Sequence, residues 1–206
     1  MTGNNIKELL NRIHHADCLE FMRQLPDKCI DLVLTDPPYG IGISSNPVRQ
    51  QHTKKDWDSS IPMQEVFQEI MRVSKQQIIW GGNYFNLPAS QGFFVWDKLQ
   101  PEDFSLAMCE MAYSSIQAPA KMFRYSVLKE QDKIHPTQKP VQLFKWCLSY
   151  AKLEKGIILD CFSGSGTTAL ACHDLGLDFI CIEKDPDYHA ASVKRLEQHQ
   201  QQLKLL

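Results

Sequence analysis

The run Asp36-Pro37-Pro38-Tyr39 has the residue types needed to hold an amino group together with the planar ring that carries it. A carboxylate accepts a hydrogen bond from an amino N–H, and two prolines fix the direction of a backbone carbonyl. An aromatic ring beside them can stack on a planar base. The same run could instead be a plain strand end with a solvated Asp and a packed Tyr, because short motifs often match by chance.

The segment before this run favours a functional role. Residues 30–35, Ile-Asp-Leu-Val-Leu-Thr, are rich in apolar side chains and stop at two prolines. This pattern predicts a buried strand that ends where Asp36 begins. In an open α/β sheet, ligands bind at the carboxyl ends of the strands, so the sequence places the possible amino-group site at a ligand-binding edge.

A second group of candidate residues forms the loop Phe162-Ser-Gly-Ser-Gly-Thr-Thr168, between a predicted strand and a predicted helix. Its glycines let a ligand approach the backbone, and with Ala169 in the third position they also fit a dinucleotide fingerprint. Asp160 would repel a pyrophosphate but could pair with an ammonium group, and Glu183 could accept both hydroxyls of a ribose. S-adenosylmethionine, an adenosine with an amino acid and no phosphate, fits both carboxylates. A purely structural turn remains the alternative.

Strand-like and helix-like segments alternate along the chain, which indicates a mostly parallel sheet with helices on both faces. The predicted strands are 12–17, 30–35, 77–80, 93–96, 107–113, 157–161 and 178–183. The predicted helices are 19–25, 63–73, 141–151, a helix that follows Thr168 and ends at Leu175, and 192–206. A length of 206 residues fits one domain, 1–206. The polar segment 40–60 is expected to be a long loop, and such loops are commonly functional or disordered.

Composition narrows the protein class. Apolar residues make up 43% and charged residues 22%, which is ordinary for a soluble globular protein. No apolar stretch could span a membrane, and the start of the chain has no secretory pattern. Seven cysteines without a Cys-x-x-Cys pair favour reduced thiols in a cytoplasm and no metal site. Residues 121–155 carry a net charge of +5 against −7 elsewhere, which fits a phosphate-facing stripe or solvated lysines.

The two groups of residues, in this order, resemble the DNA amino-methyltransferases of the permuted β class. In that family Asp-Pro-Pro-Tyr is the catalytic motif and Phe-x-Gly-x-Gly is the S-adenosylmethionine motif. Residues 134–140 and Asp17-Cys18 match its other cofactor motifs, so the resemblance covers nearly the whole chain. It implies an α/β, circularly permuted Rossmann-like methyltransferase fold with a mostly parallel seven-stranded sheet. In such a sheet the first strand, 12–17, lies beside the last, 178–183.

The resemblance also implies roles for individual residues. Asp36 and the Pro37 carbonyl would accept the two N–H bonds of the target amino group, Pro38 would set the backbone, and Tyr39 would stack on a base flipped out of the duplex. Asp160 would meet the methionine ammonium and Glu183 the ribose. The other implied cofactor residues are Lys139, Thr167 and Thr168 at the methionine carboxylate, Asp17 and Phe162 around adenine, and Cys18, Asp36, Thr137, Ser163, Gly164, Ser165 and Gly166.

The implied reaction is methyl transfer from S-adenosylmethionine to the exocyclic N6 of adenine in double-stranded DNA. In this family Asp at the first position of the catalytic motif is commoner with adenine, and Ser with cytosine. The alternatives are cytosine N4 and an amino or amide group of RNA or protein. An inactive partner subunit of a methyltransferase and a nicotinamide-dependent oxidoreductase also remain open.

The chain departs from its restriction-type relatives in one respect. Only about twenty residues separate Tyr113 from His135, too few for a folded target-recognition module. We therefore expect a small form with a short or relaxed target, which contacts DNA through loops at about 40–60 and 114–133. The candidate DNA contacts are Arg49, Lys54, Lys55, Tyr84, Lys121 and Arg124. We expect a cytoplasmic location in a bacterial or phage-infected cell, and a homodimer stays open.

Overall fold

The computed structural model describes residues 6–41, 60–101, 107–126, 134–135 and 137–202. The strands are β1 (Arg12–His15), β2 (Ile30–Thr35), β3 (Ser74–Trp80), β4 (Gly92–Asp97), β5 (Cys109–Ser114), β6 (Lys121–Arg124), β7 (Ile157–Asp160) and β8 (Asp178–Glu183). The α-helices are α2 (Cys18–Met22), α3 (Gln64–Val73), α4 (Val141–Ala151), α5 (Thr167–Leu175) and α6 (Pro186–Gln202), with short 3-10 turns η1 (Lys7–Leu9) and η4 (Gly82–Tyr84). None of the helices in these ranges is long and apolar enough to cross a membrane.

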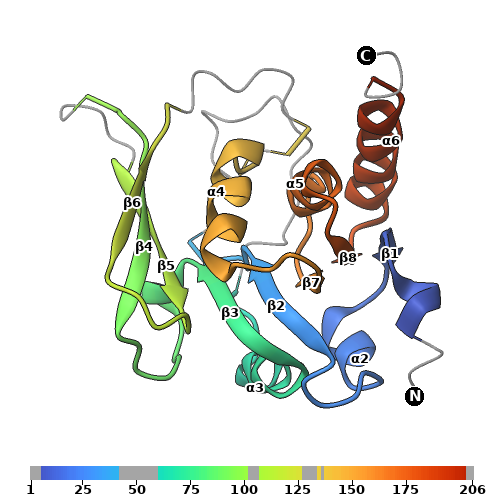
Figure 1. Cartoon of the computed structure of the whole chain (residues 1–206), viewed down its shortest axis with the longest axis horizontal. Helices are drawn as coiled ribbons and strands as arrows, with labels where there is room; N and C mark the ends of the chain where they lie inside the picture. Colours follow the sequence, from blue (N-terminus) through green and yellow to red (C-terminus); the bar gives the residue numbers. More distant parts are fainter. Residues whose placement is uncertain (1–5, 42–59, 102–106, 127–133, 136, 203–206) are drawn as a thin grey trace.

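The strands form one sheet in the order β1-β8-β7-β2-β3-β5-β4-β6 (Figure 1). From β1 to β3 every neighbouring pair is parallel, whereas β5 runs antiparallel to both β3 and β4, and β6 is parallel to β4. The first and last strands, β1 and β8, lie side by side, with Arg12 opposite Ile180. This arrangement confirms the predicted adjacency of the two chain ends in the sheet.

Helices cover both faces of the sheet, with α4, α5 and α6 on one side and α2 and α3 on the other (Figure 1). Along β2, Leu32 and Leu34 join the buried cluster under α4 and α5, whereas Val33 joins the cluster under α2 and α3. The alternation follows from the two-residue period of a strand, because both faces of a covered sheet must be apolar.

The sheet has eight strands, so the prediction of seven is wrong by one. The additional strand, β6, lies inside the segment 114–133 that was expected to be a loop. Its backbone pairs with β4, and the Phe123 ring lies 5.3 Å from the Trp146 ring on α4. Because β6 has only four residues and begins and ends with a basic side chain, its sequence pattern is that of a surface loop. Tertiary pairing with β4 stabilises it as a strand.

The topology gathers charged residues at one edge of the sheet. Parallel strands end at the same edge, so Asp36 after β2, Asp160 at the end of β7 and Glu183 at the end of β8 come together there. The antiparallel strand β5 begins at that edge and adds Glu110. The connections from neighbouring β2 and β7 lead to opposite sides of the sheet, which is the switch point where α/β folds bind ligands.

Candidate active site

A cavity of about 1640 Å³ opens at this edge of the sheet. It exceeds the roughly 300–1,000 Å³ of ordinary small-molecule pockets, so it can take a cofactor and a further group together. The predicted residues that line it are Asp17, Cys18, Asp36, Pro37, Pro38, Tyr39, Tyr84, Thr137, Lys139, Asp160, Phe162, Ser163, Gly164, Ser165, Thr167 and Glu183. The other two predicted cofactor residues lie just behind this lining, since Gly166 caps α5 and Thr168 donates a hydrogen bond to Asp160.

Asp36 is half-buried and contacts the half-buried Tyr39 and the buried Lys139. The Tyr39 hydroxyl donates to Asp36 Oδ1 at 2.6 Å, and the Lys139 ammonium donates to Asp36 Oδ2 at 2.5 Å. Burial raises the pKa of the Asp36 carboxyl, and the neighbouring Lys139 charge opposes that rise. Burial also raises the pKa of Tyr39 well above its ordinary value, so its hydroxyl stays a neutral donor.

Two residues that the sequence interpretation missed, Glu110 and Lys98, complete this group. Lys139 Nζ lies 2.9 Å from Glu110 Oε2, and Lys98 Nζ lies 2.6 Å from Glu110 Oε1. Although burial acts in the opposite direction, the two lysines lower the pKa of Glu110 to about 2. The carboxylates of Asp36 and Glu110 and the ammonium groups of Lys98 and Lys139 thus form one group whose formal charges cancel. The available signal was an acid inside an otherwise apolar strand, because a buried acid needs a partner.

The Tyr39 ring packs against the turn that follows β3. Tyr84, which is 43% exposed, stacks on it with ring centroids 4.8 Å apart and planes 13° from parallel. Gly81 in the same turn has φ +71°, and a Cβ atom there would lie 2.1 Å from Tyr39 Cε1. Only glycine lets the backbone come this close to the ring, so the turn fixes the position of Tyr39.

Asp160 lies in the half of the cavity built by the glycine loop. Its carboxylate accepts hydrogen bonds from the Thr35 hydroxyl at 2.7 Å, the Phe162 amide at 3.1 Å and the Thr168 hydroxyl. Burial raises the pKa of Asp160 to about 6, against the lowering effect of these donors. No basic side chain of the described residues forms an ion pair with Asp160, so this buried carboxylate can bind a ligand that brings an ammonium group.

Glu183 supports the glycine loop from the next strand. Its Oε2 accepts from the Gly164 amide and its Oε1 from the Asp185 amide, both at 2.8 Å, while burial raises the pKa of Glu183. Gly164 and Gly166 have φ values of +48° and +75°, which favour glycine. Asp17 caps α2 by accepting from the Leu19 amide at 3.0 Å. The bond from the Gly164 amide to Glu183 thus fixes the backbone of the glycine loop beside the cavity.

The hydroxyl of Ser163 tests whether a polar ligand fits this half. Ser163 Oγ is buried, lines the cavity and has no hydrogen-bond partner among the residues that the structure describes. Buried hydroxyl groups are normally paired, so this hydroxyl can form a hydrogen bond with a polar ligand in the cavity. Across the described ranges, no group of three or more His, Cys, Asp and Glu side chains could hold a metal ion.

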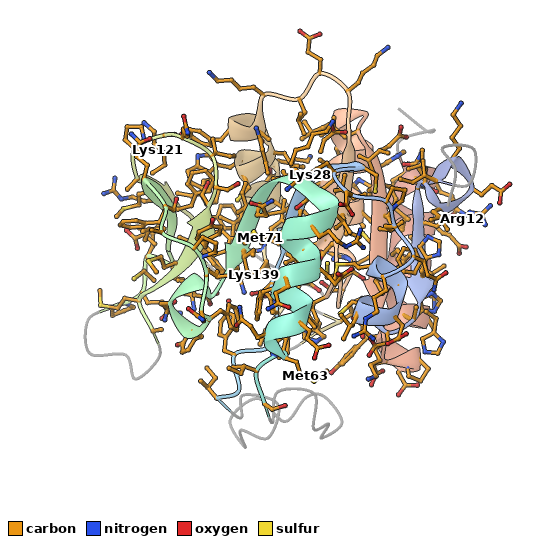
Figure 2. The ribbon with its side chains drawn as sticks, turned by 90° about the horizontal axis from the view of Figure 1, so that it is seen from below. Arg12, Lys28, Met63, Met71, Lys121 and Lys139 are labelled. Carbon is orange, nitrogen blue, oxygen red and sulfur yellow. The ribbon has the colours of Figure 1, made fainter. Side chains whose placement is uncertain are left out.

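Two of the predicted cofactor residues, Lys139 and Thr167, make contacts within the protein. Lys139 Nζ is directed to Asp36 and Glu110, and the Thr167 hydroxyl donates to the Lys139 carbonyl at 3.1 Å. Their contact with a methionine carboxylate stays a prediction. Figure 2 shows Lys139 near the middle of the molecule and Lys121 at its outer edge.

The predicted DNA contacts are spread over different parts of the chain. Arg49, Lys54 and Lys55 lie outside the described residues. Lys121 and Arg124 belong to β6 and do not line the cavity, and Arg124 Nε lies 3.4 Å from Asp97 Oδ2. Among the members of this group that the structure describes, Tyr84 lines the cavity. Contact between these side chains and DNA stays a prediction.

A family model described as DNA methylase, for the N6 and N4 methyltransferases, matches residues 79–194. The chain belongs to this DNA methylase family. The match confirms the resemblance seen in the sequence motifs, and DNA is accordingly a partner of the protein. Among curated relatives, the type II methyltransferase M.HinfI of Haemophilus influenzae is 26% identical, covering 96% of this chain and 71% of its own. The type II methyltransferase M2.DpnII of Streptococcus pneumoniae is 25% identical, covering 89% and 88%.

Solved structures of DNA methylases share the fold. The M1.HpyAVI complex with S-adenosylmethionine has a TM-score of 0.60 and 22% identity, covering 90% of this chain and 98% of its own. The cytosine-N4-specific PvuII DNA methyltransferase has a TM-score of 0.64 and 17% identity, covering 92% and 89%. At this level of identity the likeness shows the fold, and it confirms the predicted α/β methyltransferase architecture.

Proposed function

We propose that this DNA methylase transfers a methyl group from S-adenosylmethionine to the exocyclic N6 of adenine in duplex DNA, after the base has flipped out of the helix. The observation that supports it most is the shared cavity. It joins the Asp36 carboxylate, suited to an amino group, to the Asp160 and Glu183 carboxylates, suited to an ammonium group and a ribose. A dinucleotide would place phosphates beside Asp160, which that carboxylate repels.

The residues of the acceptor half orient the target amino group. Asp36 and the Pro37 carbonyl accept its two N–H bonds, so its lone pair points away from them and toward the methyl group. S-adenosylmethionine supplies a methyl group on a positively charged sulfur. The new N–C bond forms as the C–S bond breaks, and the nitrogen then loses a proton to Asp36 or to water. Alignment of this kind lowers the barrier by removing orientational freedom beforehand.

The residues of the cofactor half bind the donor. Asp160, the buried carboxylate with a raised pKa, receives the ammonium group, and Glu183 receives the ribose hydroxyls. Ser163 Oγ gains the partner that it lacks within the described residues. Asp17 and Phe162, which also line the cavity, lie around the adenine ring.

Adenine is the preferred target because Asp rather than Ser occupies the first position of the catalytic motif. Cytosine N4 is the second candidate, since the structure of the cytosine-N4-specific PvuII enzyme shares the fold with a TM-score of 0.64. An RNA or protein substrate is less favoured, because the matching family is one of DNA methylases.

Methyl transfer from labelled S-adenosylmethionine to duplex DNA, followed by mass analysis of the released nucleosides, tests the proposal. We expect N6-methyladenine from the natural chain and at least about a hundredfold loss in D36A, the range typical of a positioned catalytic group. D27A is a suitable control, because the Asp27 side chain is 75% exposed and does not line the cavity. Formation of N4-methylcytosine would instead favour cytosine N4 as the target. Labelling of RNA or protein but not of DNA would reject the proposal.

A further inference from the structure

Lys139 lies between two carboxylates, of which only Asp36 belongs to the catalytic motif. Its ammonium group is 2.5 Å from Asp36 Oδ2 and 2.9 Å from Glu110 Oε2, and its side chain is 5% exposed. A buried ammonium group needs a counter-ion throughout the reaction, because an unpaired buried charge is strongly destabilising. The role of Glu110 therefore depends on what happens to Asp36 when a substrate arrives.

Both oxygens of Asp36 already accept hydrogen bonds, Oδ1 from the Tyr39 hydroxyl and Oδ2 from Lys139. On the proposed function, the target amino group must donate an N–H to this same carboxylate. It then competes with Lys139, which is the stronger donor because it is charged. If Asp36 were its one counter-ion, Lys139 would either exclude the amino group or be left unpaired.

Glu110 supplies the second counter-ion from a rigid part of the sheet. It pairs with Trp96 across β5 and β4, and Lys98, just beyond β4, contacts its other oxygen at 2.6 Å. Glu110 also lies within reach of the Tyr39 hydroxyl, with 3.3 Å between Tyr39 Oη and Glu110 Oε2. The Glu110 carboxylate therefore contacts both groups that donate hydrogen bonds to Asp36, the Tyr39 hydroxyl and the Lys139 ammonium group.

We propose that Glu110 is a positioning residue of the methyl-acceptor half, which holds the Lys139 ammonium while Asp36 accepts the target amino group. It acts through Lys139 and does not touch the base. Lys98 keeps Glu110 in place and balances its charge. The inference rests on the proposed function and adds to it a residue outside every motif recognised in the sequence.

The test is E110Q, which keeps the shape of the side chain and removes its charge. In E110Q, Lys139 has Asp36 as its one carboxylate partner within this group, so Asp36 is less available to the amino group. We expect kcat for methylation of duplex DNA to fall at least about tenfold, while the Kd for S-adenosylmethionine, measured by calorimetry without DNA, changes less than about threefold. E69Q is the matched control: Glu69 also pairs with a basic residue and is 19% exposed against 20% for Glu110, but it lies outside the cavity lining.

A second variant, K98M/E110Q, tests whether Glu110 acts as the counter-ion of Lys139 or only neutralises the charge of Lys98. The proposal expects this double variant to stay as slow as E110Q, and if E110Q alone does not fold, the double variant carries the same prediction. Recovery of kcat in the double variant would show that Glu110 only neutralises Lys98. An unchanged kcat in E110Q, or a loss of cofactor affinity as large as the loss of kcat, would also overturn the proposal. Inactivity of the natural chain on DNA would instead contradict the proposed function itself.

Discussion

At the scale of single residues, Tyr84 is the side chain best placed to control how Tyr39 meets a base. The two rings stack at 4.8 Å, and such pairs contribute about 0.5–1.5 kcal/mol beyond the area that they bury. We expect Y84A to lower kcat/KM for DNA about three- to tenfold because Tyr39 loses its support, whereas Y84F stays near the natural value. Single-turnover methylation measures both. Equal damage in Y84F and Y84A would assign the effect to the hydroxyl and contradict a stacking role.

Asp160 predicts how cofactor affinity depends on pH. Burial raises its pKa from 3.8 to about 6, so the carboxylate takes up a proton and loses its charge as the pH falls through that value. The attraction for an ammonium group is lost in the same range. We expect the Kd for S-adenosylmethionine to rise about tenfold between pH 7.5 and pH 5, as the ionised fraction falls. Calorimetry at a series of pH values measures this dependence.

The variant D160N identifies the titrating group. It lacks the charge at every pH, so we expect weak binding already at pH 7.5 and a much flatter dependence on pH. Any slope that remains belongs to other carboxyls that line the cavity, of which Glu183 also has a raised pKa because it is buried. A D160N profile as steep as that of the natural chain would mean that Asp160 is not responsible.

At the scale of elements, the turn between β3 and η4 couples backbone conformation to the site. G81A combines a positive φ with a Cβ 2.1 Å from the Tyr39 ring. G176A is its matched control, since Gly176 has φ +67° but nothing within 4 Å of an added Cβ. We expect G176A to cost about 1 kcal/mol of stability from the backbone alone. G81A should cost more and also reduce methylation, because Tyr39 must move.

Denaturant unfolding and steady-state methylation of the two glycine variants measure these effects. A G81A protein that is no less stable than G176A, with full activity, would show that the Tyr39 ring can shift at no cost. The comparison holds the backbone strain nearly constant, so the difference between the two variants reports the clash with the ring.

The arrangement of the strands explains which parts of the site the sequence could and could not predict. The parallel strands β2, β7 and β8 have apolar runs that end at or just before Asp36, Asp160 and Glu183, so these strands and the carboxylates at their ends followed from local patterns. Glu110 was missed because it stands at the start of an antiparallel strand, where no motif marks the active edge. Its role depends on the pairing of β5 with β4, a contact that local sequence does not encode.

Lys139 illustrates a second limit of sequence interpretation. The motif places its backbone beside the cofactor half, where the Thr167 hydroxyl contacts its carbonyl, but its long side chain reaches Asp36 and Glu110. A motif fixes where the chain passes and leaves open which way a flexible side chain points. The partner of a lysine is decided by buried charges brought in from other strands.

At the scale of the whole molecule, this chain lacks segments that M.HinfI has. The alignment with M.HinfI runs over 257 positions, more than the 206 residues of the chain, so the relative has insertions that this protein lacks. Between β5 and residue 135, the described residues form one four-residue strand, β6. Sequence-specific protein–DNA interfaces bury about 1,000–2,500 Å² of protein surface, which is more than a strand of this length can present.

We therefore expect the enzyme to recognise a short or relaxed sequence. Each well-made base contact contributes about 1–3 kcal/mol of discrimination, so strict reading of six base pairs needs many contacts beyond those at the flipped base. Sequencing of methylated positions in DNA treated with the purified protein measures this directly, and we expect sites of four defined bases or fewer. K121A/R124A should weaken binding to all sequences about equally and reduce its salt dependence, since side chains on an edge strand can reach phosphates but carry no base code. Strict recognition of six or more bases would contradict this view, and would require recognition by residues outside the described ranges or by a second subunit.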